Sequence, residues 1–368
     1  MEKVTLLEVA RRAGVHPSSA SRALSADYAK YVGEATRRKV LRAAEELGYR
    51  PNALAKGLRT GRSGVVGVVV VDFEHPFTSA ILRGIETSLE ADGLLPLVAQ
   101  THESSERLGR ALEHLIGRSV DAVITTAVHS RDAAVVESAA RRVPVVLAVR
   151  TLSETGLPTV AHDDFAGGVL AARHLLGLGH RRVAQLCGPL DVSSFVQRRR
   201  GFRHELAAAG ASEVDFEMEA TSGVLEEGRR LAGALLERGG ELPSALFAHN
   251  DLLAVGAMDV LAAAGLSCPG DVSIIGYDDM LLADHLSPAL TTLSLPSYHL
   301  GQLAARLTVS MIEDPDSPPA TVSLPPTLVV RGSTAEPGSA ATVVTRAGPP
   351  PVAASRSGRA PAGRPSST

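Results

Sequence analysis

The side chains best suited to contact a polyanion lie near the start of the chain. The outer side of a short predicted helix that begins at Pro17 carries the hydroxyl and guanidinium groups of Ser18, Ser19, Ser21 and Arg22. Residues 1–62 contain 13 Lys and Arg against 6 Asp and Glu, a net charge of +7, whereas residues 63–332 carry −13 and residues 333–368 carry +3. A basic head on an acidic body indicates a polyanion partner for the N-terminal region.

Two further helices are expected to hold this polar helix in place. Thr5-Leu6-Leu7-Glu8 is a capping box, because the Thr5 hydroxyl can accept from the amide of Glu8 and Glu8 can reach back. Gly14 suits the tight turn that follows, and a third helix is predicted over 35–47. The residues expected to face inward are Leu6, Val9, Ala10, Ala13, Ala20, Ala23, Leu24, Val40, Leu41 and Ala44.

Two short helices joined by a tight turn, with a polar second helix, are the arrangement that reads DNA in helix-turn-helix proteins. Pro17 fits the start of the second helix, where a missing N–H costs nothing. The alternative is a plain three-helix bundle with a solvated basic face. The helices alone leave both interpretations open.

The middle of the chain alternates short apolar runs with Ala-, Leu- and Arg-rich helical stretches. Strands are predicted over 65–71, 95–99, 122–125, 143–149, 183–187, 245–248 and 272–276, and an amphipathic helix over 79–92. Such alternation predicts parallel sheets buried on both faces. About 265 residues are many for one such sheet, so two lobes are expected, with ligands at the carboxyl ends of the strands.

Several classes of function are excluded by missing signals. The sequence has no Gly-x-Gly-x-x-Gly turn, phosphate loop, His-Glu-x-x-His or Gly-x-Ser-x-Gly motif, so no enzyme is predicted. Its 12 histidines are scattered and its two cysteines lie far apart, so neither a metal nor a cofactor is expected. No apolar run reaches the ~18 residues of a membrane helix, and no signal-peptide core is evident, which predicts a cytoplasmic protein.

Two segments carry a resemblance to a known family. Residues 4–22, VTLLEVARRAGVHPSSASR, and residues 46–59, ELGYRPNALAKGLR, resemble the start of LacI/GalR-family repressors. The similarity continues with few gaps to about residue 332, roughly nine tenths of the chain. It implies an all-α helix-turn-helix head with a hinge helix, followed by a two-lobed α/β domain like the type I periplasmic binding proteins.

The resemblance assigns DNA-binding roles in the head. It places Ser18 and Arg22 in the major groove, where an arginine can pair with O6 and N7 of guanine. Phosphate-contacting positions, which fix register without reading sequence, match Thr5, Ser19, Ser21, Tyr49 and Asn52, and the DNA-binding set also includes Leu6 and Pro17. The family's usual residues are replaced at His16, Ala20 and Gly33, which leaves the motif intact.

Residues 52–59 resemble the family's hinge helix. Leu58 would wedge into a central minor-groove step, where unstacking is offset by the contacts that a bent duplex allows. Ala55 would lie close to its dyad partner, and Lys56 belongs to the same set; ordinary helix packing is the alternative for Leu58. Gly57 disfavours a helix by ~1 kcal/mol relative to alanine, so the hinge is expected to order only on the operator.

The resemblance also implies an effector-binding set. Its members are Phe77, Thr78, Val149, Val192, Ser194, Arg198, Phe247, Asn250 and Asp278. Phe77 would stack on the ligand, Arg198 would clamp its oxygens and Asp278 would accept from its hydroxyls. Each has a structural alternative. Phe77 could be a core residue, Arg198 could lie at a solvated helix start, and Asp278 could cap a helix. Asn250 could form a turn.

Three departures from the family's usual residues narrow the class of effector that we expect. Val149 stands where many members carry an acid, Val192 where purine-binding members carry a base-reading arginine, and Thr78 replaces a second aromatic residue. We therefore expect a neutral sugar, or a sugar derivative with an apolar edge.

The combined prediction is a homodimeric repressor that binds palindromic operator DNA and is switched by a small carbohydrate. The expected domains are a head over 1–50, a hinge and linker over 51–63, an effector and dimerisation domain over 64–332 and a disordered tail over 333–368. An extracytoplasmic sugar-binding protein is disfavoured by the basic head. A regulator controlled by a partner protein is the other alternative.

Overall fold

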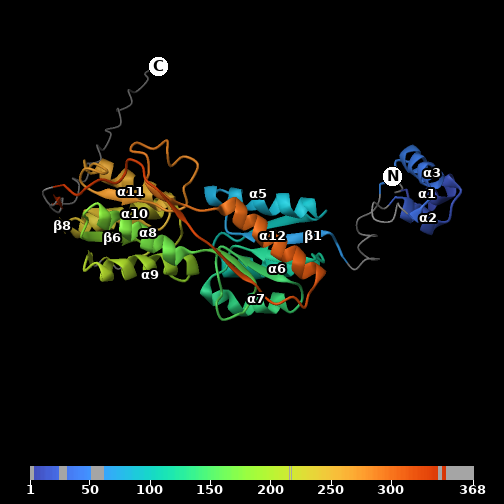
Figure 1. Cartoon of the computed structure of the whole chain (residues 1–368), viewed down its shortest axis with the longest axis horizontal. Helices are drawn as coiled ribbons and strands as arrows, with labels where there is room; N and C mark the ends of the chain where they lie inside the picture. The colour runs from blue at the N-terminus through green and yellow to red at the C-terminus, as the bar shows by residue number, and fades with distance from the viewer. Residues whose placement is uncertain are drawn as a thin grey trace, which may run out of the picture. The chain divides into compact units, whose positions relative to one another are not determined.

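The computed structural model describes residues 4–24, 31–50, 62–214, 216, 218–338 and 342–344 (Figure 1). Within them lie a helical head and a body of parallel sheets covered by helices, which confirms the predicted fold class. The predicted hinge helix, with Asn52, Ala55, Lys56 and Leu58, lies outside the described residues. Among the described helices, none is long and apolar enough to cross a membrane.

The described part of the head contains α1 (Leu6–Ala13), α2 (Pro17–Ala23) and α3 (Glu34–Glu46). The capping box of Thr5 and Glu8 is present, and Gly14 turns the chain with a φ of 66°. The buried core of the head comprises Val9, Ala10, Ala20, Ala23, Val40, Ala43 and Ala44.

One inward-facing residue of the third helix is predicted wrongly. Leu41 is 43% exposed, whereas Ala43 is buried beside Val40 and Ala44. Residues three and four positions apart share one face of a helix, so a core centred on Val40 selects 43 and 44 and turns 41 outward.

The chain divides into two compact units. The first comprises residues 1–164, 191–196 and 295–326, and the second comprises residues 165–190, 197–294 and 327–368. We refer to them as unit 1 and unit 2. Each unit therefore collects segments that lie far apart in the sequence.

Unit 1 contains a parallel sheet of six strands. In the order in which they pair, the strands are β12 (Thr321–Leu324), β5 (Thr159–His162), β4 (Val145–Ala148), β3 (Ala122–Thr125), β1 (Val65–Val70) and β2 (Leu95–Gln100). Its helices are α5 (Pro76–Ala91), α6 (Ser105–Gly117), α7 (Ala133–Ala140) and α12 (Ser297–Glu313), with a short 3₁₀ turn, η2, over Ser130–Asp132.

Alternating side chains of β1 bury both faces of this sheet. Val66, Val68 and Val70 pack in the cluster that includes α5 and α12, whereas Val69 packs in the cluster that includes α6 and α7. These two pairs of helices therefore cover opposite faces of the sheet. Strand β2 departs from the prediction of full burial, because it is an edge strand whose Leu95 is 66% exposed.

Two glycines allow α5 and α12 to approach closely. A Cβ added to Gly84 would lie 2.1 Å from the carbonyl oxygen of Tyr298, and one added to Gly301 would lie 2.2 Å from that of Ile81. Since real Cβ atoms do not approach backbone oxygen so closely, the two helices can cross at this distance only with glycine at both positions.

Unit 2 contains a smaller parallel sheet in the order β10 (Ser273–Ile275), β9 (Ala245–Ala248), β6 (Arg182–Leu186) and β7 (Ser212–Glu213). Two antiparallel pairs accompany it, β11 (Thr292–Ser294) with β13 (Thr327–Val329) and β8 (Gly240–Glu241) with β14 (Val343–Val344). Its helices are α8 (Asp164–Gly177), α9 (Ser193–Ala208), α10 (Leu225–Arg238) and α11 (Asp251–Ala263), of which the first residues of α8 and α9 belong to unit 1.

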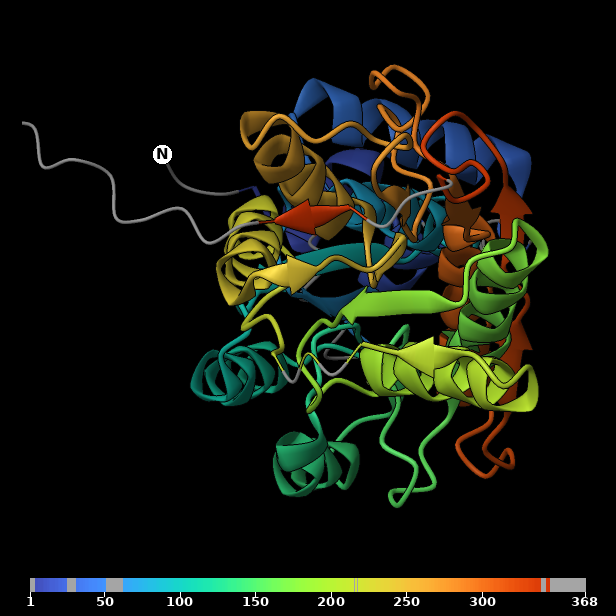
Figure 2. The same ribbon diagram turned by 90° about the vertical axis from the view of Figure 1, so that its left-hand side faces the viewer.

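The prediction that disorder begins at residue 333 is wrong for the described part of the tail. Ser333 is fully buried, its carbonyl oxygen accepts from the amide of Ile274 at 2.8 Å, and its hydroxyl donates to the carbonyl of Ile274 at 2.6 Å. Farther on, β14, drawn in red in Figure 2, pairs with β8. Hydrogen bonds along strand edges thus order a segment whose composition gave no apolar periodicity.

Candidate functional site

The outer face of α2 presents two polar side chains one turn apart. Ser18 and Arg22 are both exposed, and the Nε of Arg22 donates to the carbonyl of Ser18 at 3.2 Å. His16 caps the helix, because its Nδ1 accepts from the amide of Ser18 at 3.2 Å and lies 2.7 Å from the Ser18 hydroxyl. The His16 side chain thus caps this helix, while the guanidinium group of Arg22 stays exposed to solvent.

The other head residues of the predicted DNA-binding set fall into two groups. Thr5 is exposed, and its hydroxyl is held 2.9 Å from Glu8, so it is both a cap and a surface group. The half-buried members are Leu6, Pro17, Ser19, Ser21 and Tyr49. Leu6 and Tyr49 pack against the head core, and burial raises the pKa of the Tyr49 phenol. Leu6 and Tyr49 therefore have a packing role in addition to any contact with DNA.

In unit 1, three residues of the predicted effector set lie at the carboxyl ends of strands or just beyond them. Phe77 is in the first turn of α5, half-buried, with its ring centroid 5.7 Å from that of His162. Thr78 is buried beside it, and Val149 directly follows β4. This edge of a parallel sheet is where α/β folds bind ligands, so these three residues lie where the prediction requires.

Val192 and Ser194 are also buried and belong to unit 1. Between them, the hydroxyl of Ser193 accepts from the amide of Thr151 at 2.8 Å, and just before them the carbonyl of Asp191 accepts from the amide of Ser130 at 2.8 Å. Val192 has no exposed surface, so its observed role is packing.

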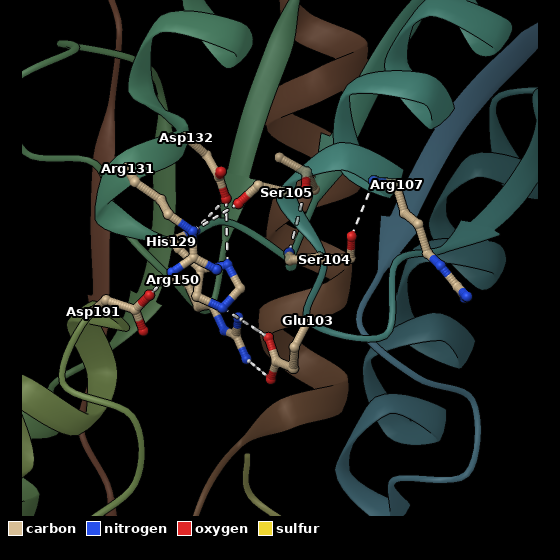
Figure 3. A network of polar contacts seen from close by, with 11 residues as sticks. Glu103, Ser104, Ser105, Arg107, His129, Arg131, Asp132, Arg150 and Asp191 are labelled. Atoms are coloured by element: carbon tan, nitrogen blue, oxygen red, sulfur yellow. Dashed lines mark hydrogen bonds and ion pairs between the residues drawn. The ribbon is translucent and has the colours of Figure 1, made fainter. Parts of the chain in front are cut away.

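A polar network that the sequence reasoning missed lies at the same edge of unit 1 (Figure 3). The Glu103 carboxylate accepts two hydrogen bonds from Arg150, at 2.8 and 2.6 Å, and lies 3.1 Å from Nε2 of His129. The other ring nitrogen of His129 lies 3.3 Å from Asp132. These residues follow β2, β4 and β3, so a search for charged residues after each predicted strand would have found them.

The network lowers the pKa of Glu103 and raises that of His129. Burial by itself raises the pKa of Glu103, but hydrogen bonds from Arg150 and His129 outweigh it and lower that pKa to about 2. Burial opposes the charged form of His129, yet bonds to Asp132 and Glu103 prevail and raise the pKa of the imidazole. The carboxylate is therefore an anion at any physiological pH.

In unit 2, Arg198 is the centre of the predicted set. Only 4% of its side chain is exposed, so the alternative of a solvated helix start is wrong. Its guanidinium lies 3.7 Å from the centroid of the Tyr277 ring, 3.8 Å from Oδ1 of Asp278, and donates to the carbonyl of His249. A buried cation with an aromatic and a carboxylate partner suits recognition of a polar ligand.

Two other residues of unit 2 have evident structural roles. Asn250 caps α11, because its Oδ1 accepts from the amide of Leu253 and its Nδ2 donates to the carbonyl of Gly223, both at 2.8 Å. Phe247 is fully buried and stacks on Phe202 with ring centroids 4.9 Å apart. Binding of an effector by either of them stays a prediction.

Asp278 lies in a strained turn after β10. Its φ is 116° and that of Asp279 is 55°, regions that residues other than glycine rarely adopt. The amide of Asp278 donates to the carbonyl of Leu293 at 2.9 Å, and Arg331 holds Asp279 through a 2.7 Å ion pair. Strain of this kind persists where the surroundings determine the backbone, as at ligand sites. No helix begins among the described residues between β10 and β11, so Asp278 is not a helix cap.

Asp251, which the sequence reasoning did not select, supports this turn. Its carboxylate accepts from the Thr292 hydroxyl at 2.6 Å and from the amide of Met280 at 2.7 Å, and its own amide donates to the carbonyl of Tyr277. Burial raises its pKa to about 6 despite these bonds. Its position directly after Asn250 at a strand end was the available signal.

The described residues offer no cluster of side chains suited to a metal ion. Within the part of the chain that the structure describes, no group of three or more His, Cys, Asp or Glu could hold a metal ion. Both cysteines are free thiols whose pKa is raised by burial, to about 12 for Cys187 and about 11 for Cys268. Neither thiol is therefore activated as a nucleophile or as a ligand.

Comparison with known proteins agrees with both parts of this description. The profile described as "Bacterial regulatory proteins, lacI family" matches residues 5–52, and the "Periplasmic binding protein-like domain" profile matches residues 172–334. The ribose operon repressor of Escherichia coli K12 is 32% identical over 336 residues, covering 89% of this chain and 99% of the repressor.

Two solved structures are similar over most of the chain. The lac repressor dimer bound to operator and the anti-inducer ONPF has a TM-score of 0.81 and 28% identity, covering 91% of this chain and all of that chain. The complex of the transcriptional regulator CelR with cellobiose has a TM-score of 0.68 and 32% identity, covering 90% and 100%. These relatives are transcriptional regulators; the lac repressor is bound to operator and ONPF in its structure, and CelR is bound to cellobiose in its own.

Proposed function

The chain belongs to the LacI family of bacterial regulatory proteins, and from this premise we propose that it is a repressor that binds a two-fold-symmetric operator as a homodimer. The observation that carries the proposal is the exposed pair Ser18 and Arg22 on a capped helix inside a basic head. An arginine in this position can donate to both O6 and N7 of guanine, which reads one base pair. A regulator of this kind works at the chromosome, so its place is the cytoplasm.

The homodimer follows from the size of the head. A single small DNA-binding module buries too little surface to reach a specific Kd of ~10⁻⁸ M. A dimer that contacts two half-sites buries about twice as much. Footprinting on genomic fragments should therefore show two related half-sites about one helical turn apart. A single unpaired half-site would contradict the dimer.

The direct test of DNA reading compares two arginines of the head. Arg22→Ala should weaken operator binding while leaving binding to random DNA nearly unchanged. Arg42→Ala is the matched control, because Arg42 is exposed on α3 and paired with Glu46. Equal losses on operator and random DNA for Arg22→Ala would show that Arg22 contacts only phosphate.

The effector proposed for the body is a neutral sugar or sugar derivative. Support comes from unit 2, where the buried Arg198 beside Asp278 offers donors and an acceptor for vicinal hydroxyls. Unit 1, taken by itself, has the half-buried ring of Phe77, which suits an apolar sugar face. Position 192 is a valine, whereas recognition of a purine base would need an arginine there. No catalytic activity is proposed, because these groups bind rather than activate a nucleophile.

Calorimetry tests the effector class. Titrations with D-ribose, cellobiose, hypoxanthine and ribose 5-phosphate should show binding of a neutral sugar, and Asp278→Ala should abolish it. Tight hypoxanthine binding, or undiminished sugar binding by Asp278→Ala, would contradict the assignment. To act as a switch, the effector must bind the DNA-bound and the DNA-free protein with different affinities, because equal affinity would leave the equilibrium between them unchanged.

A further inference from the structure

The backbone at Val149 has an unusual conformation. Its φ is 70°, in the left-handed region that β-branched residues avoid because Cβ and its branches crowd the neighbouring carbonyls. Val149 directly follows β4 and is 9% exposed. Since valine gains nothing from this conformation, contacts around it must hold it there.

Backbone hydrogen bonds supply part of the restraint. The amide of Val149 donates to the carbonyl of Val160 at 2.9 Å, and the amide of Arg150 donates to the carbonyl of Ala148 at 2.8 Å. The amide of Thr151 donates to the Ser193 hydroxyl at 2.8 Å. These bonds fix both sides of the turn, but an ordinary strand end could also form the first of them.

The side chain of Arg150 supplies the remaining restraint. It is 7% exposed and forms the paired hydrogen bonds to Glu103 that Figure 3 shows. A buried guanidinium is costly unless a carboxylate matches its geometry. Glu103 therefore determines where Arg150 lies, and with it the direction of the chain immediately after Val149.

The same carboxylate reaches a second part of the predicted effector set. Glu103 binds His129, whose backbone amide donates to Asp132 at 2.8 Å in the turn that also contains Ser130 and Arg131. Arg131 forms an ion pair with Asp191, the residue that precedes Val192. Figure 3 shows Asp191 beside Arg131 on the far side of the network from Glu103.

We propose that Glu103 is a positioning residue for effector selectivity: through Arg150 it holds Val149 in the left-handed conformation, and through His129 it supports the segment that carries Val192 and Ser194. This inference rests on the proposed function, because it concerns residues assigned there to effector binding. Glu103 contacts Arg150 and His129, and in this proposal it acts on the effector through the residues that it holds.

The structural test is the backbone of Val149 in a Glu103→Gln variant. A neutral amide cannot match both guanidinium donors, so a crystal structure of the variant should show Val149 with a negative φ. Arg150→Lys keeps the positive charge but cannot form the two parallel hydrogen bonds to Glu103, so it should also give Val149 a negative φ. It is the variant to use if Glu103→Gln does not fold. A positive φ retained in the folded variant overturns the proposal, whichever ligand the protein binds.

The functional test is a double-mutant cycle on sugar affinity. With D-ribose and cellobiose as probes, Glu103→Gln should weaken binding of the preferred sugar at least tenfold in the parent protein. It should weaken binding less than threefold in a Val149→Gly background, because glycine adopts the left-handed conformation freely. Glu113→Gln, which removes a similar two-bond pair with Arg142 on the surface of unit 1, is the control and should leave affinity unchanged.

The outcomes separate the two proposals. If the parent protein binds neither sugar, the sugar assignment fails and the Val149 backbone still decides the role of Glu103. If the parent binds a sugar but Glu103→Gln has equal effects with valine and with glycine at 149, the positioning role is refuted and the proposed function stands.

Discussion

Replacing Asp251 by asparagine should change how the stability of the protein depends on pH. Asp251 is the buried carboxylate beneath the strained turn at Asp278, and burial raises its pKa to about 6 from the usual 3.8. A carboxyl group whose pKa is raised by folding binds a proton in the folded state before it does so in the unfolded state. Its contribution therefore makes the fold more stable as the pH falls from about 7 to 4.

The size of this effect follows from the two pKa values. At pH 7.5 the carboxyl group is ionised in both states, and at pH 5 it is protonated only in the folded state. The free energy of unfolding should then gain about 1.4 kcal/mol from this group between pH 7.5 and pH 5. Asp251→Asn cannot titrate, so it should lack this gain, whatever stability it loses at neutral pH by presenting a donor to Thr292 or Met280.

Urea denaturation at the two pH values measures the difference. The quantity to compare is the change in the free energy of unfolding from pH 7.5 to pH 5, because all other titrating groups cancel between the variant and the parent. Asp259→Asn is the control, since Asp259 lies on the same helix with an exposed carboxylate paired to Arg229, and it should follow the parent. If the change from pH 7.5 to pH 5 were the same for Asp251→Asn and the parent, within about 0.5 kcal/mol, the account of Asp251 as a buried carboxyl group with a raised pKa would be refuted.

Three other substitutions test separate parts of the description. Arg22→Ala should cost about 1–3 kcal/mol of discrimination at one base pair per half-site, measured by competition among operators mutated at single positions. Leu58→Ala should reduce DNA bending in a phasing assay and leave sugar affinity unchanged; undiminished bending would contradict the wedge that the family resemblance implies. Gly84→Ala should destabilise unit 1 by about 1–3 kcal/mol, because its Cβ would lie 2.1 Å from the carbonyl oxygen of Tyr298. Gly109→Ala, whose Cβ would meet only Val135 at 3.5 Å, should not, and equal melting temperatures for the two variants would argue against the close helix crossing.

Much of the fold could be predicted because its elements carry local signals. The capping box of Thr5 and Glu8 and the apolar runs over 122–125 and 245–248 depend on neighbours in sequence, and the structure forms them at those positions. The strands β5, β11 and β12 were missed because three or four residues of mixed type become strands only through their partners in the sheet.

The candidate site divides in the same way. Arg198 and Asp278 could be proposed from family-like positions, and the structure brings them within 3.8 Å of each other. Glu103 and Asp251 follow predicted strands, which was an available signal, but their roles could not be predicted, because each acts through residues that are remote in sequence: Arg150 is 47 positions from Glu103, and Thr292 is 41 positions from Asp251. Their roles depend on which strand ends are adjacent, and that order follows from the topology of the sheets rather than from any local motif.

The positions of β12, α12 and the segment around Ser333 have a consequence for synthesis on the ribosome. The edge strand and one covering helix of unit 1 come from residues 297–324, and Ser333 covers the edge of β10 in unit 2. Neither unit of the body can therefore be completed until nearly the whole chain has left the ribosome, whereas the core of the head is contained in residues 4–50. At about 5–20 residues per second, a nascent chain would carry a finished head for roughly 15–60 seconds before it has a finished body. Ribosome-bound chains stopped at residue 320 should thus contain a protease-resistant head attached to a body that protease still digests.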